Sequence, residues 1–246
     1  MIDAEAVSTR LGELRGLIAS VERAHRHDVE IVAVTKGFGE WAIDAAVDAG
    51  CTVIGENYAQ ELVSKREAVE RRAPTVEFIG RLQTNKVRLV ADLVDVWASV
   101  DRSSVIGEIA KRAPGARILV QVDTTGDPGK GGCAVGDVAR LVTVAREQGL
   151  AVDGLMTVGP TGEPPHAARS GFRIVRGLVD DLGLAVCSLG LSADLVVAVE
   201  EGSTEVRVGT ALFGPRPPRA CVARDPGLLS TGGWPCAASL RHAGGL

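Results

Sequence analysis

Lys36 lies where an apolar run of the sequence stops: IVAVT (31–35) leads into it, and Gly37 follows at once. A buried ammonium group is costly unless it is paired or gives up its charge. Such a lysine has three chemical interpretations: it neutralises a bound phosphate, it forms a structural ion pair, or its pKa is lowered so that it forms a Schiff base. Its position among apolar residues favours the Schiff base, in which the amine condenses with an aldehyde.

Two glycine-containing stretches further along have the composition of an anion site. The first, CSLGLSAD, contains Ser192, and the second, VRVGTALFG, contains Arg207, Gly209 and Thr210. Glycines let the backbone approach an anion, and a helix starting near Ser192 would add donors and a positive dipole. Ser192 could instead simply cap that helix, and Arg207 could be an inward-facing charge paired with a carboxylate. Together with a neighbouring lysine, the pattern favours a phosphate site.

Eight short β-branched runs alternate with helical patterns such as AQELVSKREAVERR (59–72), which predicts right-handed βαβ units and a parallel sheet. Eight such units predict an α/β protein with a single (β/α)8 TIM barrel, a fold of about 250 residues. Closure would place strand one beside strand eight, so Lys36 would meet the loops after strands seven and eight, where this fold recurrently binds phosphate. A doubly wound open sheet is the alternative, but TKGFGE lacks the third glycine of a dinucleotide-binding turn. The runs cover residues 31–35, 52–54, 76–79, 96–100, 117–123, 152–158, 185–190 and 205–209.

The two ends of the chain differ from this alternating region. At the N-terminus, apolar residues at steps of four and three predict an extra helix with one apolar stripe. The members of the stripe are Val7, Leu11, Leu14, Ile18 and Val21. The last stretch is rich in Pro, Gly and Ala and has no periodicity. We therefore predict a barrel domain over residues 1–216 and a flexible tail over residues 217–246.

The composition excludes several classes of function. The chain is 46% hydrophobic and 3% aromatic, with a formal net charge of -4, so neither a concentrated basic surface nor base-stacking platforms for nucleic acid are expected. No apolar stretch approaches the roughly 18 residues of a membrane helix, and no basic head with an apolar run marks a signal peptide. The five cysteines form no Cys-x-x-Cys pair, and the four histidines lack metal-ligand spacing. These patterns predict a cytoplasmic protein that binds no nucleic acid, membrane or metal.

Six stretches, in order over residues 31–214, are highly specific when taken together: AVTKGF, IGENYAQELVSK, FIGRLQTNK, LVQVDTTGDPGKGG, GLMTVG and LGLSADLVVAVEEGSTEVRVGTALFG. In these stretches the chain resembles the pyridoxal phosphate homeostasis proteins, the barrel-only relatives of alanine racemase. The resemblance implies a (β/α)8 barrel that holds pyridoxal 5'-phosphate (PLP) as a Schiff base on Lys36. The sequence differs from the family pattern at Glu77 and Arg81, which flank FIG (78–80), because many members have His before FIG and His or Pro after it.

The resemblance also implies roles for five further residues. Ser192, Gly209 and Thr210 match the phosphate-binding residues of the family. Arg207 matches the arginine that faces the pyridine side of the cofactor, and Asn57 matches a residue lining the cofactor pocket.

The function implied by the resemblance is that of a carrier and buffer in vitamin B6 homeostasis, which hands PLP to apo PLP enzymes and is not itself an enzyme. A PLP racemase needs a base on each face of its substrate, and in alanine racemase the second is a tyrosine from an additional β-domain of the partner subunit. This chain has no residues left for that domain, which also favours a monomer, and its sole tyrosine, Tyr58, is expected to have a packing role. The alternatives are an amino-acid racemase acting through a dimer and a Schiff-base aldolase on a phosphorylated sugar.

Overall fold

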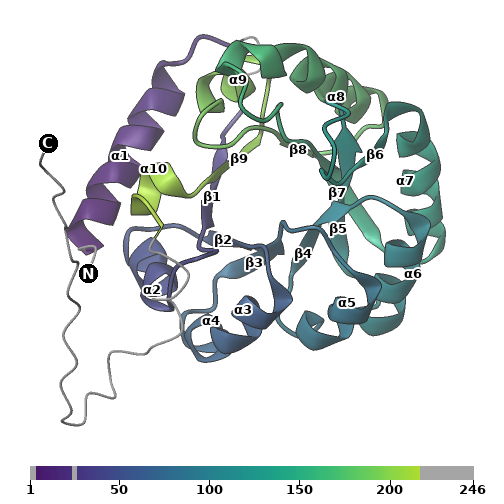
Figure 1. The fold of residues 1–246 in the computed structure, drawn as a ribbon, viewed down its shortest axis with the longest axis horizontal. Coiled ribbons are helices and arrows are strands. Elements are labelled where there is room, and N and C mark those ends of the chain that lie inside the picture. The colour runs from purple at the N-terminus through teal and green to yellow at the C-terminus, as the bar shows by residue number, and fades with distance from the viewer. Residues whose placement is uncertain (1–3, 24–26, 217–246) are drawn as a thin grey trace, which may run out of the picture.

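The computed structural model describes residues 4–23 and 27–216. Parallel strands form a closed ring in the order β1-β2-β3-β4-β5-β7-β8-β9, and β9 pairs with β1 to close it (Figure 1). The strands are β1 Glu30–Val34, β2 Val53–Glu56, β3 Thr75–Phe78, β4 Val96–Val100, β5 Arg117–Asp123, β6 Cys133–Ala134, β7 Ala151–Met156, β8 Val186–Ser188 and β9 Glu205–Val208. The ring confirms the predicted (β/α)8 barrel and excludes the open doubly wound sheet.

Each of the eight predicted β-branched runs coincides with one strand of the ring, and their ends differ by at most two residues. The structure adds one short strand that the sequence did not indicate, β6. It pairs with the C-terminal end of β5 alone, with Val122 opposite Cys133. Two residues are too few to produce a recognisable alternation of apolar and polar residues.

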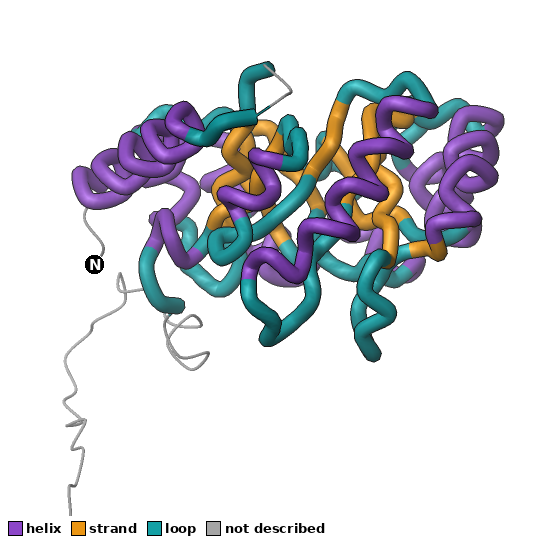
Figure 2. Tube along the Cα trace, turned by 90° about the horizontal axis from the view of Figure 1, so that it is seen from above, coloured by secondary structure: helices purple, strands orange, loops and turns teal. Residues whose placement is uncertain are grey.

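Helices cover the outside of the ring, as the second view shows (Figure 2). They are α1 Ala4–Ser20, α2 Trp41–Asp48, α3 Ala59–Ser64, α4 Arg66–Arg72, α5 Thr84–Val90, α6 Ser103–Arg112, α7 Val138–Glu147, α8 Arg169–Asp181, α9 Leu195–Glu200 and α10 Thr210–Phe213, with 3-10 turns at Val135–Asp137 and Pro165–Ala168. The predicted N-terminal helix is confirmed as α1, which packs beside α2 and α10. The continuous helical pattern over 59–72 is wrong in one respect, because the structure breaks the helix at Lys65.

The strands direct alternate side chains to the helices and to the barrel interior. On β1, Ile31 and Ala33 belong to the large apolar core shared with the helices. Val32 and Val34 face inward, because a Cβ placed on Gly55 of β2 would lie 3.0 Å from Val32 Cγ1 and 3.5 Å from Val34 Cγ2. The same alternation, continued past the end of β1, directs the side chain of Lys36 towards the mouth of the barrel.

The interior of the barrel has an apolar part and a charged part. Val96, Ala98, Leu119 and Met156 form a separate small apolar cluster inside the ring. The charged side chains that are buried there include Glu77, Glu205 and Arg207.

The predicted tail over residues 217–246 lies outside the described residues, so its character stays a prediction. Among residues 4–23 and 27–216, no helix is both long and apolar enough to span a membrane.

Candidate functional site at the C-terminal rim of the barrel

Lys36 and Gly209 lie side by side at the end of the barrel where the strands terminate, which we call the C-terminal rim. β1 and β9 are paired in register, with Val32 opposite Arg207. A Cβ placed on Gly209 would lie 3.4 Å from the carbonyl oxygen of Val34. Residues that are about 170 positions apart in the sequence therefore meet at one rim, because closure of the barrel makes the first and last strands neighbours.

The amine of Lys36 is half-buried and makes no hydrogen bond or ion pair with any described residue. Burial lowers the pKa of this amine, and the positive charges of Arg216 and Arg207 lower it further. Glu56 and Glu61 oppose the shift without reversing it. A larger fraction of Lys36 is thus unprotonated near neutral pH than of an ordinary lysine, and an unprotonated amine is the form that attacks a carbonyl.

A buried ionic network holds the two residues that flank Lys36. Lys65 Nζ donates to Glu56 Oε1 at 2.6 Å, to Glu61 Oε1 at 2.7 Å and to the carbonyl oxygen of Thr35 at 2.9 Å. The hydroxyl of Thr35 donates to Glu56 Oε1 at 2.6 Å, and the backbone N–H of Gly37 donates to Glu61 Oε1 at 2.5 Å. The backbone on either side of Lys36 is therefore held by hydrogen bonds to Glu61 and Lys65.

Arg207 supplies unpaired donors inside the barrel. Its side chain is 1% exposed, and its Nη2 donates to the carbonyl oxygen of Thr157 at 2.5 Å and more weakly to that of Gly190 at 3.4 Å. Its Nε and Nη1 are buried and have no hydrogen-bond partner among the described residues, and the hydroxyl of Ser188 is in the same state. Buried donors of this kind are rare in native proteins unless a ligand or water satisfies them.

Ser192, Gly209 and Thr210 are brought together at the same rim. The backbone N–H of Gly209 donates to Ser192 Oγ at 3.4 Å, a long contact that a better acceptor could displace. Thr210 is exposed and is the first residue of α10. These three residues offer hydroxyl and backbone N–H groups to an anion, with a glycine that permits close approach.

The capping role considered for Ser192 is wrong. The helix that follows, α9, begins at Leu195, so Ser192 lies three residues before it. The residue at the cap position is Asp194, whose Oδ1 accepts the backbone N–H of Leu191 at 2.5 Å. α9 and α10 have six and four residues. Helices this short contribute little dipole, so the positive end expected near Ser192 is weak.

Asn57 directly follows β2 and is half-buried at the rim. Its side chain makes no hydrogen bond within the described ranges. Gly80, after β3, packs so closely on the backbone of Asn57 that a Cβ at position 80 would overlap the Asn57 carbonyl group. The absence of a side chain at position 80 thus sets the place of Asn57.

Comparison with known proteins agrees with this architecture. The family model for the alanine racemase N-terminal domain matches residues 10–217. A pyridoxal phosphate homeostasis protein of Aquifex aeolicus is 38% identical over 208 residues, which cover 79% of this chain and 91% of the relative. The chain belongs to the pyridoxal phosphate homeostasis protein family. Another relative in this family, from Escherichia coli K12, is 33% identical over 229 residues, which cover 85% of this chain and 97% of the relative.

Solved structures related to this homeostasis-family chain include PipY of Synechococcus elongatus. PipY with PLP bound matches at a TM-score of 0.74 and 29% identity, covering 85% of this chain and 100% of PipY. PipY without PLP matches at a TM-score of 0.75 and 30% identity. A lysine decarboxylase of Selenomonas ruminantium matches at a TM-score of 0.63 but only 15% identity, so it shares the fold alone.

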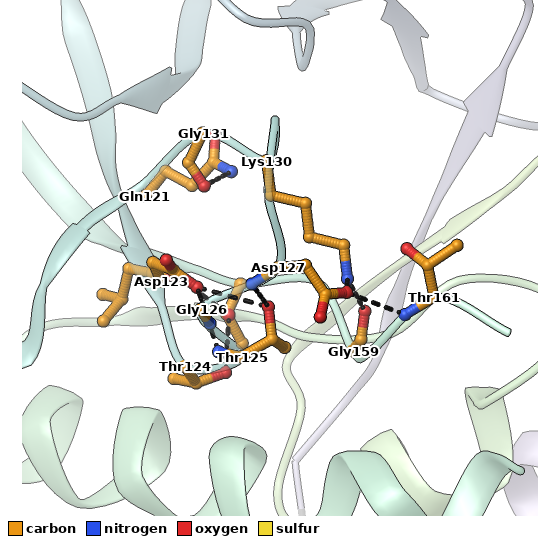
Figure 3. Close-up of polar contacts among 12 residues, drawn as sticks. Gln121, Asp123, Thr124, Thr125, Gly126, Asp127, Lys130, Gly131, Gly159 and Thr161 are labelled. Carbon is orange, nitrogen blue, oxygen red and sulfur yellow. Dashed lines mark hydrogen bonds and ion pairs between the residues drawn. The ribbon is translucent and has the colours of Figure 1, made fainter. Parts of the chain in front are cut away.

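The homeostasis-family chain has a second lysine at the rim, Lys130, but this one is fully engaged. Figure 3 shows its Nζ between two acceptors: the carbonyl oxygen of Gly159 at 2.5 Å and Asp127 Oδ2 at 2.6 Å. Asp127 also accepts the backbone N–H of Thr161 at 3.0 Å, so the loop after β5 is tied to the loop after β7. Of Lys36 and Lys130, Lys36 is therefore the one whose amine has no hydrogen-bond or ion-pair partner among the described residues.

Two buried carboxyl groups lie in the barrel interior of this family member and balance Arg207. The carboxyl groups of Glu77 and Glu205 lie close enough to interact, and two like charges in one buried place favour a proton on one of them. Burial raises the pKa of Glu77 well above its ordinary value, and the negative charge of Glu205 raises it further. The carboxylate partner that was considered for Arg207 is thus provided by two residues, Glu77 and Glu205. They act on Arg207 through their charge and not through a hydrogen bond.

Several residues that shape this homeostasis-family site were not identified from the sequence. Glu56, Glu61 and Lys65 lie in IGENYAQELVSK, and the i,i+4 spacing of Glu61 and Lys65 was a usable signal for an ion pair. Thr157 binds Arg207 through its backbone carbonyl, which no side-chain pattern could reveal.

The contact between Gly80 and Asn57 gives a testable prediction. Gly80→Ala is expected to displace Asn57 and to lower the free energy of unfolding by about 1–3 kcal/mol, because overpacking against backbone cannot be relieved by a rotamer change. Urea denaturation measures the loss. Gly16→Ala is the matched control, since nothing lies within 4 Å of a Cβ at that position of α1; it should be neutral or slightly stabilising. Equal stability of the two variants would contradict the assigned contact.

Proposed function

We propose that this chain binds PLP reversibly through the amine of Lys36 and acts as a non-catalytic carrier and buffer of the cofactor. One observation carries the proposal: within the described part of the chain, the amine of Lys36 has no partner and a lowered pKa, and it lies at a rim that also presents unsatisfied donors. The names of the relatives and the PLP-bound structure of PipY support it.

The residues at the rim fit the parts of PLP. The cofactor supplies an aldehyde, which condenses with a primary amine and releases water. Lys36 provides that amine. Ser192, Gly209 and Thr210 would bind the phosphate, and the unpaired Nε and Nη1 of Arg207 would face the pyridine side. Asn57 would line the pocket, held in place by Gly80.

The chemistry of Arg207 favours a carrier over a general carbanion catalyst. A guanidinium group stays protonated to a pH above about 12, so it cannot accept a proton from the ring nitrogen. The ring would then be a weaker electron sink than one paired with a carboxylate. The single tyrosine of the chain, Tyr58, is 47% exposed, which suits it poorly to be the second base of a racemase.

The proposal extends to a cytoplasmic monomer that hands PLP to apo-enzymes. Three described cysteines, Cys51, Cys133 and Cys187, are free and buried, in agreement with a reducing compartment. Light scattering of the purified chain at several concentrations tests the monomer, and a concentration-dependent mass would contradict it.

Borohydride trapping tests the binding reaction. The full chain is incubated with PLP, reduced with borohydride, weighed by mass spectrometry and digested to locate the modified residue. We expect one phosphopyridoxyl group, on Lys36, and a visible absorption band before reduction. Lys36→Ala should lose both, whereas Lys130→Ala, the matched rim control, should keep both. A chain that gains no mass, or a Lys36→Ala variant that is still modified at the rim, would overturn the proposal.

The racemase alternative is tested with the same material. L-Alanine or L-serine is incubated with the PLP-loaded chain, and optical rotation is followed over time. We expect rotation to stay constant. A loss of rotation that disappears in Lys36→Ala would replace the carrier by an enzyme.

A further inference from the structure

Arg216, which no sequence pattern assigned to the site, lies across the rim between the loops of β1 and β9. A Cβ placed on Gly37 would lie 3.0 Å from Arg216 Cδ, and a Cβ placed on Gly209 would lie 3.7 Å from Arg216 Nη2. One side chain thus reaches from the residue after Lys36 to the glycine of the candidate phosphate site. The guanidinium group is exposed and forms no ion pair or hydrogen bond within residues 4–23 and 27–216.

The packing of α10 fixes the place of Arg216. Phe213, at the end of α10, packs against Phe38 and Trp41, with ring centroids 5.3 and 6.1 Å away, and Phe38 and Trp41 are 5.7 Å apart. This aromatic cluster joins the loop after β1 to α10. Gly214 then takes a backbone conformation with φ 78° and ψ -167°, which residues with a side chain rarely adopt. The chain therefore turns at Gly214 and places Arg216 over Gly37.

Among the described residues, the three that were assigned to the phosphate carry no formal positive charge of their own. Ser192, Gly209 and Thr210 offer neutral donors, and the adjoining helices are too short to add much dipole. Arg207 is fully buried and already donates to a backbone carbonyl. A phosphate monoester carries between one and two negative charges near neutral pH, so a cation beside these donors would strengthen its binding considerably.

We propose that Arg216 binds the phosphate group at this site and makes the site selective for PLP over unphosphorylated pyridoxal. The inference rests on the proposed PLP binding at Lys36. A guanidinium group suits the role because its planar fork can donate two parallel hydrogen bonds to phosphate oxygens. Its charge also lowers the pKa of the Lys36 amine, so the same residue would favour both the anion and the reactive form of the amine.

Selectivity between PLP and pyridoxal tests the assignment, because the two aldehydes differ in the phosphate. Dissociation constants of both are measured on the full chain at fixed pH and ionic strength, from the absorption change on binding. Arg216→Ala is expected to weaken PLP binding about tenfold relative to pyridoxal binding, the effect of losing one charge-assisted hydrogen bond. Arg216→Lys keeps the charge but not the fork, so it should recover part of the preference. Any effect through the pKa of Lys36 acts on both aldehydes and cancels in the ratio.

Arg81→Ala is the matched control, since Arg81 is an exposed arginine in the loop after β3 at the same rim. It should leave the ratio unchanged. An unchanged ratio of the two dissociation constants in Arg216→Ala would overturn the assignment. An equal fall of PLP affinity in Arg81→Ala would also overturn it, because the effect would then come from the general positive charge of the rim and not from a contact of Arg216. Wild-type chain that takes up no PLP would refute the proposed function itself, whereas wild-type uptake with an unaltered ratio in Arg216→Ala would refute only the role of Arg216.

Discussion

Lys65→Met is expected to lower the free energy of unfolding by about 3–5 kcal/mol, because it removes the cation from a buried ionic network. The side chain of Lys65 is 3% exposed and that of Glu56 is 0% exposed. Methionine conserves most of the volume, so the loss reports charge and hydrogen bonding. Burial already raises the pKa of Glu56, and the nearby charge of Lys65 opposes that shift. Without Lys65 the Glu56 carboxyl is left buried and uncompensated. Urea denaturation at neutral pH measures the change.

A second substitution separates charge from packing. In Lys65→Met/Glu56→Gln the uncompensated carboxylate is gone, so part of the lost stability should return. Arg71→Met is the matched control: Arg71 pairs with Asp44 at 2.9 Å, but the side chains are 54% and 36% exposed, and such a pair contributes little. If Lys65→Met were no more destabilising than Arg71→Met, the network would have no structural role.

The same variant should affect PLP uptake. Lys65 holds Glu61, and Glu61 accepts the backbone N–H of Gly37, the residue after Lys36. Lys65 also donates to the carbonyl of Thr35, the residue before it. Loss of Lys65 thus releases both residues that flank Lys36. Weaker PLP binding in the folded variant, measured well below its unfolding midpoint, would show that the network orients Lys36.

The fold and the meeting of Lys36 with Gly209 followed from the sequence because both depend on periodicity. Eight apolar runs separated by helices favour a closed ring, and closure brings the first and last strands together. The ionic network around Lys65 could not be predicted from the sequence. It depends on the end of α3 at Ser64 and on the contact between the side chain of Lys65 and the backbone of Thr35. Composition suggested a cap at Ser192, yet the loop continues to Leu195 before it becomes helical. Arg216 could not be identified from the sequence, because its position depends on the backbone of Gly214 and on the packing of the three aromatic rings before it.

Glu77→Gln is expected to remove a pH dependence of stability that the wild-type chain shows. Glu77 and Glu205 are both buried inside the barrel, and the charged groups that act on Glu77 besides Glu205 are Arg207 and Arg117. Because burial and Glu205 raise the pKa of Glu77 in the folded chain, the folded state retains a proton that the unfolded state releases above about pH 4.5. The stability due to this proton is complete below that pH and falls by about 1.4 kcal/mol per pH unit up to the raised pKa.

In Glu77→Gln a neutral amide, which cannot titrate, replaces the carboxyl group of Glu77. The difference in unfolding free energy between Glu77→Gln and wild type should therefore shift in favour of the variant by about 1.4 kcal/mol for each pH unit above 4.5, until the raised pKa is passed. Urea denaturation at a series of pH values measures it, and groups that titrate alike in both chains cancel in the difference. Glu13→Gln, at an exposed position of α1, is the control and should give a difference that does not vary with pH. A pH-independent difference for Glu77→Gln as well would mean that folding does not raise the pKa of Glu77.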